Sequence, residues 1–355
     1  MGSAPVCEPF DLTPLIAAAH LDYGGPCRCV PTAAWPQEIL QSIADPSYHV
    51  QRVHFSELSV GAFRRRASSC RNPLVVTGLG PHLAPYGLTA AVLRAVIPVD
   101  LVVPVRGQPA RRAADFFEAL QQDEPLYLAD APIAHHFPWL YQLIKVPRYF
   151  RHCFCHRTRQ NLSIAYDTPA LFVGGAGTLS SLHVDQMCSN FWMYLGEGAK
   201  HWTCFHPDDA PLLSPMFDEP EQIDRFAPLA QTAVPSHARR IEFVLQAGEL
   251  LYIPWGTPHE VLNLTATTAV SANYLDQTNI DATVAQGRAK LDHRAAGSSR
   301  HDNLRATLDA LDEIEWPCLD DDVDEAEQAS LPGEAMATSF PAHERLQRSK
   351  PVKLG

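Results

Sequence analysis

The sequence lacks a continuous run of about 18 apolar residues, the length from which a membrane-spanning helix is predicted. Its N-terminus also lacks a basic segment followed by an apolar stretch, which argues against a secretory signal. Myristoylation after Gly2 is not predicted either, because Val6 stands where the motif needs Ser or Thr. We therefore expect an intracellular protein, nuclear or cytoplasmic, that does not bind membranes.

Cysteine spacing gives no sign of a disulfide framework. The nine cysteines are scattered and odd in number, so we expect reduced thiols. Cys27 and Cys29 lack a second pair at zinc-site spacing, and we interpret them as loop residues. The run His152-Cys153-Phe154-Cys155-His156 suggests a metal site, but on a strand its histidines and cysteines would face opposite sides. We expect this run to have a structural role.

Positive charge is scarce, because 28 Lys and Arg stand against 40 Asp and Glu and give a formal net charge of −12. This balance disfavours broad nucleic-acid binding, which depends on neutralising phosphates. The run Arg64-Arg65-Arg66 is interpreted as the solvated face of a helix. Six acidic residues fall within 320–327, and residues 317–355 contain few large apolar side chains. We predict that this acidic tail is disordered.

The first half of the chain mixes helical and extended patterns. Residues 1–46 are rich in proline and small residues and are expected to be partly irregular. Residues 47–160 alternate between apolar runs of strand length and amphipathic segments, which predicts an α/β unit. Strands are expected near 50–55, 74–79, 101–103 and 126–128, and helices over 59–68, 88–97, 113–120 and 133–145.

From residue 161 to 280 the pattern changes to short strands separated by glycines. They are expected at 171–173, 190–195, 201–205, 241–245, 250–253, 261–264 and 267–274. Their spacing predicts a mainly β protein with a two-sheet antiparallel barrel, interrupted at 207–238 by a surface excursion near its mouth. Helices expected at 282–291 and 304–314, within a unit of residues 281–316, would cap the barrel or form a homodimer.

Two histidines and one carboxylate form the candidate metal centre. On a strand, the side chains of His183 and Asp185 would share a face about 7 Å apart, whereas on a helix they would diverge. His259 follows in the second half of the β region. Such a set leaves coordination positions open, which fits either a hydrolytic zinc site or an Fe(II) site of an oxygenase.

The residues around His259 match the second cupin motif: glycine, five residues, proline, any residue, glycine, two residues, histidine, three residues and asparagine, from Gly248 to Asn263. The proline ends one strand and the second glycine allows a turn, so that His259 opens the next strand at the barrel mouth. Lys200 lies on a neighbouring predicted strand. A buried lysine there requires an anionic partner, which a dicarboxylic cosubstrate would provide; the alternative is a lysine at a hairpin turn.

Residues 47–280 resemble the Jumonji-C (JmjC) family of 2-oxoglutarate oxygenases, and within it the small Jumonji hydroxylases. The resemblance implies a double-stranded β-helix fold, a jelly-roll related to cupins, in which His183, Asp185 and His259 bind Fe(II). The motifs that carry it are Pro125-Leu-Tyr-Leu-Ala-Asp130, Val146-Pro-Arg-Tyr-Phe150, Ser180-Ser-Leu-His-Val-Asp185, Gly198-Ala-Lys-His-Trp202, the cupin motif, and His259-Glu-Val-Leu-Asn-Leu264 running on to Asn273.

The resemblance also implies a cosubstrate pocket. Lys200 would pair with the distal carboxylate of 2-oxoglutarate, assisted by Ser180 where the family usually has threonine. The remaining residues that the resemblance places around the cosubstrate are Asn273, Tyr127 and Asn190. The sequence departs from the family at Met193, ten residues after the first ligand, where asparagine is often found.

The activity that the resemblance implies is hydroxylation of a protein side chain. It would consume 2-oxoglutarate and O2, release succinate and CO2, and be supported by ascorbate. The same chemistry on an N-methyl group would release formaldehyde, so demethylation of a histone or another methylated chain is an alternative. A non-catalytic cupin-like binding module is a second alternative. An RNA hydroxylase also occurs in the family, but the acidic composition does not favour it.

Overall fold

A computed structural model describes residues 48–69, 71–151, 153, 169–216, 225–231, 234–293, 296–297 and 299–312. The predicted irregular segment 1–46 with Cys27 and Cys29, the acidic tail 317–355 and all of the cluster 152–156 except Cys153 lie outside the described residues. Cys153 itself is buried among apolar side chains. Within these ranges, no helix has both the length and the apolar character that crossing a membrane requires.

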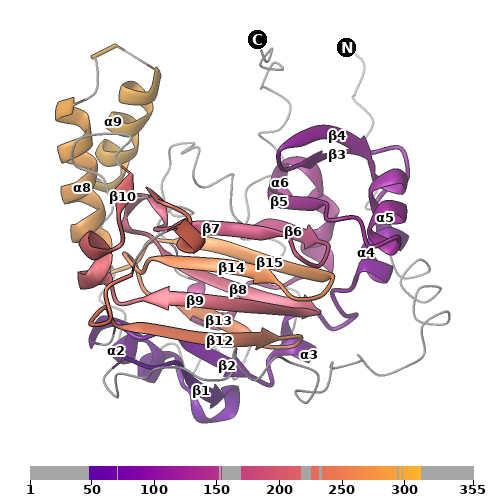
Figure 1. Ribbon diagram of the computed structural model, residues 1–355, viewed down its shortest axis with the longest axis horizontal. Helices are drawn as coiled ribbons and strands as arrows, with labels where there is room; N and C mark the ends of the chain where they lie inside the picture. The colour runs from indigo at the N-terminus through magenta and orange to yellow at the C-terminus, as the bar shows by residue number, and fades with distance from the viewer. Residues whose placement is uncertain are drawn as a thin grey trace, which may run out of the picture.

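Two β-sheets form the centre of the molecule (Figure 1). The larger has seven strands in the order β1-β2-β13-β8-β15-β6-β5, and the smaller has six in the order β10-β11-β7-β14-β9-β12. The strands of the larger sheet are β1 (Gln51–His54), β2 (Leu74–Thr77), β5 (Tyr127–Pro132), β6 (Ala170–Gly174), β8 (Asn190–Glu197), β13 (Leu250–Ile253) and β15 (Thr267–Tyr274). Those of the smaller are β7 (Leu179–His183), β9 (Ala199–Phe205), β10 (Pro215–Met216), β11 (Arg225–Phe226), β12 (Arg240–Gln246) and β14 (His259–Asn263). The two sheets together form a jelly-roll, as the strand pattern of the sequence predicted.

Helices and a small hairpin surround the sheets. The hairpin is β3 (Val102–Val105) with β4 (Gln108–Arg112). The α-helices are α2 (Val60–Ser69), α3 (Gly80–Leu83), α4 (Ala90–Val96), α5 (Ala113–Gln121), α6 (Ile133–His136), α8 (Ile280–His293) and α9 (Ser299–Asp312). The 3-10 turns are η3 (Phe55–Glu57), η4 (Pro138–Gln142), η5 (Arg148–Phe150), η7 (Gln186–Cys188), η8 (Pro207–Leu212) and η9 (Leu229–Gln231). Figure 1 shows α8 and α9 on the side of the molecule away from β3, β4 and α5.

Strand β8 is buried on both faces, which explains its nearly continuous apolar sequence. Phe191 and Met193 point into the barrel, where they join a core with Trp202 and Phe243 from the smaller sheet. Successive side chains of a strand face opposite sides, so Trp192 belongs to the outer face. Because each fully buried large apolar side chain contributes roughly 1.5–3 kcal/mol, both faces of this strand stabilise the fold.

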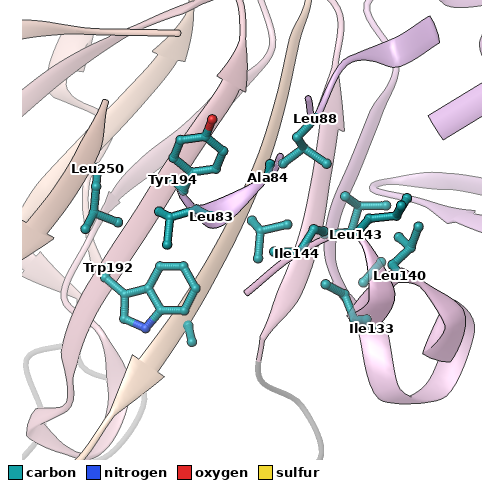
Figure 2. Packing of buried hydrophobic residues seen from close by; sticks show 14 of the residues in the cluster. Leu83, Ala84, Leu88, Ile133, Leu140, Leu143, Ile144, Trp192, Tyr194 and Leu250 are labelled. Carbon is teal, nitrogen blue, oxygen red and sulfur yellow. The ribbon is translucent and has the colours of Figure 1, made fainter. Parts of the chain in front are cut away.

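The helical elements of residues 80–144 cover part of the outer face of the larger sheet. Figure 2 shows Trp192, Tyr194 and Leu250 of that face beside Leu83 of α3, with Leu140 of η4 and its neighbours completing the cluster. Strands β1, β2 and β5 also join the larger sheet directly. The segment predicted as an N-terminal elaboration therefore shares its core with the barrel.

Several predicted elements differ from those observed. The expected helix over 133–145 is interrupted, because α6 ends at His136 and Pro138 begins a separate 3-10 turn. Proline has no N–H to donate and its ring obstructs the preceding turn of a helix, which accounts for the break. Strand β4 was not predicted because its residues are mostly polar and exposed. The excursion 207–238 contains η8, β10, β11 and η9 among its described residues.

Candidate metal centre and anion pocket

His183 ends strand β7 and lies directly opposite His259, which begins strand β14. The register shifts between these strands, so that Val261, two residues after His259, pairs with Ser180, three residues before His183. This β-bulge turns Ser180 and His183 to the same side of β7, although a regular strand would place them on opposite faces. Both therefore face the barrel interior with His259.

The two imidazole rings are oriented by backbone carbonyls. Nδ1 of His183 lies 2.7 Å from the carbonyl oxygen of Ser181, and Nδ1 of His259 lies 3.0 Å from that of Thr257. A carbonyl oxygen only accepts, so each Nδ1 carries the proton and donates it. The Nε2 atoms are thereby left with free lone pairs. This is the arrangement by which outer partners orient histidines that bind metals.

The sequence spacing predicts Asp185 on the same strand as His183. In the structure β7 ends at His183, and Asp185 lies two residues beyond it, directly before η7. Its Oδ1 is 3.7 Å from Nε2 of His183. One ligand atom from each of His183, Asp185 and His259 lies within 4.8 Å of the other two, which is close enough to hold one metal ion. We refer to these three residues as the triad.

Burial differs across the triad and shifts the pKa of His259 and that of Asp185. His259 is 2% exposed, and burial, with the nearby His183, lowers its pKa to about 3. Burial raises the pKa of the Asp185 carboxyl, whereas His183 and a hydrogen bond from Asn273 act in the opposite direction. The side chain of His183 is 35% exposed, so one side of the triad is open to solvent. A neutral His259 can act as a ligand throughout the physiological pH range.

Lys200 is fully buried on β9, the strand beside β14. Its Nζ lies 2.6 Å from Oδ1 of Asn263 and 3.5 Å from Oη of Tyr127. Both partners are neutral, and burial, with Arg106 as a second cause, lowers the pKa of Lys200 to about 7. A buried ammonium held by neutral groups is a site at which an anion would be stabilised.

The register of β9 and β14 links the triad to Lys200. Asn263 pairs with Lys200, and His259 pairs with Cys204, four residues further along β9. At about 3.3 Å per residue, the two pairs are separated by about 13 Å along the sheet. Trp202 lies between them on the same interior face, and its Nε1 is buried without a hydrogen-bond partner among the described residues. The interior therefore runs from the triad past Trp202 to Lys200.

Gly174 on β6 allows the close packing around Lys200. A Cβ atom at this position would lie 2.5 Å from Nδ2 of Asn263 and 2.9 Å from Oγ1 of Thr178. Nδ2 of Asn263 donates to this Thr178 hydroxyl at 2.7 Å, which directs Oδ1 of Asn263 toward Lys200. A side chain at position 174 would displace the asparagine that holds the lysine.

Arg106 adds a second cation to this pocket and was not identified from the sequence. It lies in the turn between β3 and β4, where Nη1 donates to Oγ of Ser180 at 3.0 Å and Nη2 pairs with Oδ2 of Asp130 at 2.9 Å. Its guanidinium also lies 5.1 Å from the ring centre of Tyr127. We call Arg106, Tyr127, Ser180, Lys200 and Asn263 the anion pocket. No motif surrounds Arg106, so only the fold reveals it.

The other residues expected around a cosubstrate are divided between two places. Asn273 donates to Oγ of Ser189 at 2.9 Å and to Asp185, so it lies beside the triad. Asn190 instead lies on the opposite face of β8 from Phe191, where it bonds Tyr252, Trp255 and Thr278. The structure does not bring it to the anion pocket. Met193 is a buried member of the interior core.

Comparison with known proteins adds two findings. Residues 104–280 match the family model described as a cupin-like domain. The chain is similar to an arginine-specific demethylase, JMJ22 of Arabidopsis thaliana, with 28% identity over 172 residues, covering 46% of this chain and 34% of that protein. It is also similar to the 2-oxoglutarate and iron-dependent oxygenase JMJD4 of Danio rerio, with 26% identity over 161 residues, or 44% of this chain and 37% of the relative.

A third relative is matched over a longer segment. It is the bifunctional arginine demethylase and lysyl-hydroxylase psr-1 of Caenorhabditis elegans, with 25% identity over 273 residues, covering 68% of this chain and 66% of that protein. By contrast, the matched segments span only about a third of the lengths of JMJ22 and JMJD4.

Proposed function

Because residues 104–280 form a cupin-like domain of the Jumonji-C type, we propose that the protein is an Fe(II)- and 2-oxoglutarate-dependent oxygenase that acts on a protein side chain. The proposal rests on one observation above the others. A three-ligand set within 4.8 Å shares the barrel interior with a fully buried lysine whose described partners are neutral. The first fits a divalent metal, and the second fits a carboxylate.

In this proposal, His183, Asp185 and His259 would hold Fe(II), and the carbonyls of Ser181 and Thr257 bind each Nδ1 so that each Nε2 would be free to act as a ligand. The set of two histidines and one carboxylate with open positions is typical of non-haem Fe(II) oxygenases. When bound, iron, 2-oxoglutarate and O2 supply oxidative decarboxylation of the cosubstrate to succinate and CO2, coupled to insertion of one oxygen atom into a substrate C–H bond.

The anion pocket would bind the distal carboxylate of 2-oxoglutarate. Lys200 would donate to it in its protonated form, with Tyr127 and Ser180 as hydroxyl partners and Arg106 as a second positive charge. Asn263 holds Lys200 in place, and the unpaired Nε1 of Trp202 is a further donor that a polar ligand in the interior would satisfy. Asn273 would steady Asp185 and, less directly, the part of the cosubstrate nearest the metal.

A protein substrate is supported by the names of the relatives, which include arginine demethylases and a lysyl-hydroxylase. Such a side chain would enter at the exposed side of His183. Arg225 of β11 lies next to this entrance, because it is opposite His183 in the register of β11 and β7. Hydroxylation is our first choice, and N-demethylation of arginine or lysine by the same site is the second. A nuclear location and a homodimer through α8 and α9 remain predictions, whereas the acidic composition does not favour RNA as a substrate.

The proposed units along the chain are 47–160, 161–280 and 281–316, with flanking segments 1–46 and 317–355. The first two would function as one folded body, because strands from both form the larger sheet. We therefore expect fragments that start after residue 160 to lose β1, β2 and β5 and to misfold. For this reason the tests below use the full chain.

The activity is tested by succinate formation from 2-oxoglutarate in the presence of Fe(II) and ascorbate. The wild-type protein should turn over, and Asp185→Ala should lose activity because one ligand is gone. Asp309→Ala, at an exposed aspartate of α9, is the matched control and should behave as wild type. Equal turnover by Asp185→Ala and wild type would end the proposal. Absence of turnover in every protein would favour the non-catalytic binding module.

The substrate class is tested in a cell extract incubated with the enzyme and analysed by mass spectrometry. Hydroxylation adds one oxygen atom to a peptide, whereas demethylation removes one methylene equivalent and releases formaldehyde. Modified peptides that appear with wild type but not with Asp185→Ala identify the target. Formaldehyde release would move the proposal from hydroxylase to demethylase without changing the roles of the triad.

A further inference from the structure

The turn that follows Asp185 has an unusual backbone. Met187 has φ 60° and ψ 26°, and Cys188 has φ 48°, so two consecutive residues with side chains adopt the left-handed conformation. L-residues other than glycine rarely do so, because Cβ approaches the carbonyl oxygen. Such strain persists only where the surrounding structure imposes it, and it gathers at functional sites.

Helix α8 and Asn279, the residue directly before it, supply the contacts that hold this turn. Oγ1 of Thr283 donates to the carbonyl of Met187 at 2.7 Å, and Nδ2 of Asn279 donates to the carbonyl of Cys188 at 3.0 Å. Both side chains are buried, at 0% and 1% exposure. The two carbonyls of the strained residues are thus each bound by a side chain from the start of one helix.

The same end of α8 is also connected to the segment that precedes His259. Oδ1 of Asn190 accepts from the backbone N–H of Trp255 at 3.0 Å. Nδ2 of Asn190 donates to Oγ1 of Thr278 at 2.9 Å, and that hydroxyl donates to Asp276 at 2.6 Å. The chain from Trp255 reaches His259 through Thr257, whose hydroxyl bonds the carbonyl of Pro254 at 2.7 Å.

We infer that the start of α8 and the turn before it form a clamp that sets the position of Asp185 relative to His259. The clamp comprises Thr283 and Asn279, which hold the turn after Asp185, and Thr278 with Asn190, which hold the loop before His259. These are positioning residues, because none of them belongs to the triad. The inference rests on the proposed function, since it assigns the clamp to the geometry of the metal site.

The hydroxyl of Thr283 makes one contact that is common in helices and a second contact outside its own helix. Its hydroxyl lies 3.0 Å from the carbonyl of Asn279 within α8 but 2.7 Å from that of Met187, and one hydroxyl proton serves both. Among the residues that the structure describes, Thr307 on α9 makes the first kind of contact alone, 2.8 Å to the carbonyl of Asn303 four residues earlier. The two threonines therefore differ in the bond to the strained turn.

This difference provides a matched test. Thr283→Val and Thr307→Val remove the same hydroxyl from two buried helical threonines of similar shape. We expect Thr283→Val to bind Mn(II) about tenfold more weakly than wild type, at the lower end of the effect of losing outer partners of metal ligands. Thr307→Val should bind like wild type, and Thr283→Ser should restore the affinity. Free Mn(II) is counted by its electron paramagnetic resonance signal, without cosubstrate or turnover.

Thr278→Val tests the second arm of the clamp at a position that is only half-buried. It should also weaken Mn(II) binding, because Asn190 loses its partner in the turn before α8. Wild-type affinity in both Thr283→Val and Thr278→Val would overturn the clamp, as would an equal loss in Thr307→Val. If Thr283→Val melts well below Thr307→Val, Thr278→Val alone decides. Failure of the wild-type protein to bind Mn(II) would instead reject the metal site, and with it the proposed function.

Discussion

Lys200 destabilises the folded protein in its charged form, and the same burial makes it a binding group for a carboxylate. In the folded, ligand-free protein its pKa is lowered from 10.5 to about 7, first by burial and then by Arg106. Between these pH values the unfolded chain binds a proton that the folded chain does not, so this residue makes stability rise with pH. The penalty is fully present below about pH 7 and is relieved as the pH approaches 10.5. A bound carboxylate would reverse the preference by stabilising the ammonium.

This reversal predicts proton uptake on binding of 2-oxoglutarate. At pH 8.5, Lys200 should be largely neutral in the free protein and protonated in the complex, whereas at pH 6 it should be protonated in both. Calorimetric titrations in two buffers of different ionisation enthalpy measure the difference. Lys200→Met should show weaker binding without the uptake. Buffer-independent heats for wild type at pH 8.5 would contradict the role of Lys200.

Individual site residues could be predicted from the sequence where they stand at fixed positions within a motif. The triad and Lys200 came from histidine, carboxylate and lysine at motif spacings. Arg106 could not be predicted because its position depends on how the β3–β4 turn packs against β5 and β7. The side chain of Asn190 points away from the anion pocket, contrary to the prediction. The sequence of β8 could not show this, because the strand is buried on both faces and its apolar pattern does not distinguish them.

At the scale of elements, the hairpin of β10 and β11 is held by a small core of its own. Phe226 is 4% exposed and packs with Leu182, Phe205 and Leu213. Arg225, the residue before Phe226, is opposite His183 in the strand register. This core therefore holds the hairpin against the end of β7. The excursion 207–238 is therefore anchored next to the triad, which a run rich in proline and aspartate did not reveal.

Truncation of this anchor gives a stability prediction. Phe226→Ala should lower the free energy of unfolding by about 3 kcal/mol, through lost burial and the cavity left behind. Tyr86→Ala, at an aromatic that is 40% exposed, is the control and should change stability by less than about 0.5 kcal/mol. Denaturant unfolding of the three proteins measures the differences. A cost for Phe226→Ala as small as that of the control would mean that the hairpin is not anchored by this cluster.

The bulge in β7 and the strained turn η7 were also beyond prediction. A regular period of two places Ser180 and His183 on opposite faces, and only the extra residue in β7 brings both inward. Met187 and Cys188 adopt positive φ without a glycine to signal it. Both irregularities lie within five residues of Asp185, where local strain is held by contacts from distant parts of the chain.

For the whole molecule, the fold was largely predictable and its division into parts was less so. Alternating short strands and the cupin motif predicted a jelly-roll, which the two sheets and the family match confirm. However, β1, β2 and β5 belong to the same sheet as the barrel strands, and α8 holds the turn beside the triad. Segments predicted as an elaboration and a cap are thus built into the support of the site.

The central claim is that the triad and the anion pocket bind one iron and one 2-oxoglutarate together. It is tested most directly by anaerobic titration of the protein and Fe(II) with 2-oxoglutarate, followed by visible absorption. We expect a weak charge-transfer band that saturates in wild type, needs more 2-oxoglutarate in Lys200→Met, and is absent in Asp185→Ala. A wild-type protein without the band, or an equal band in Asp185→Ala, would contradict it.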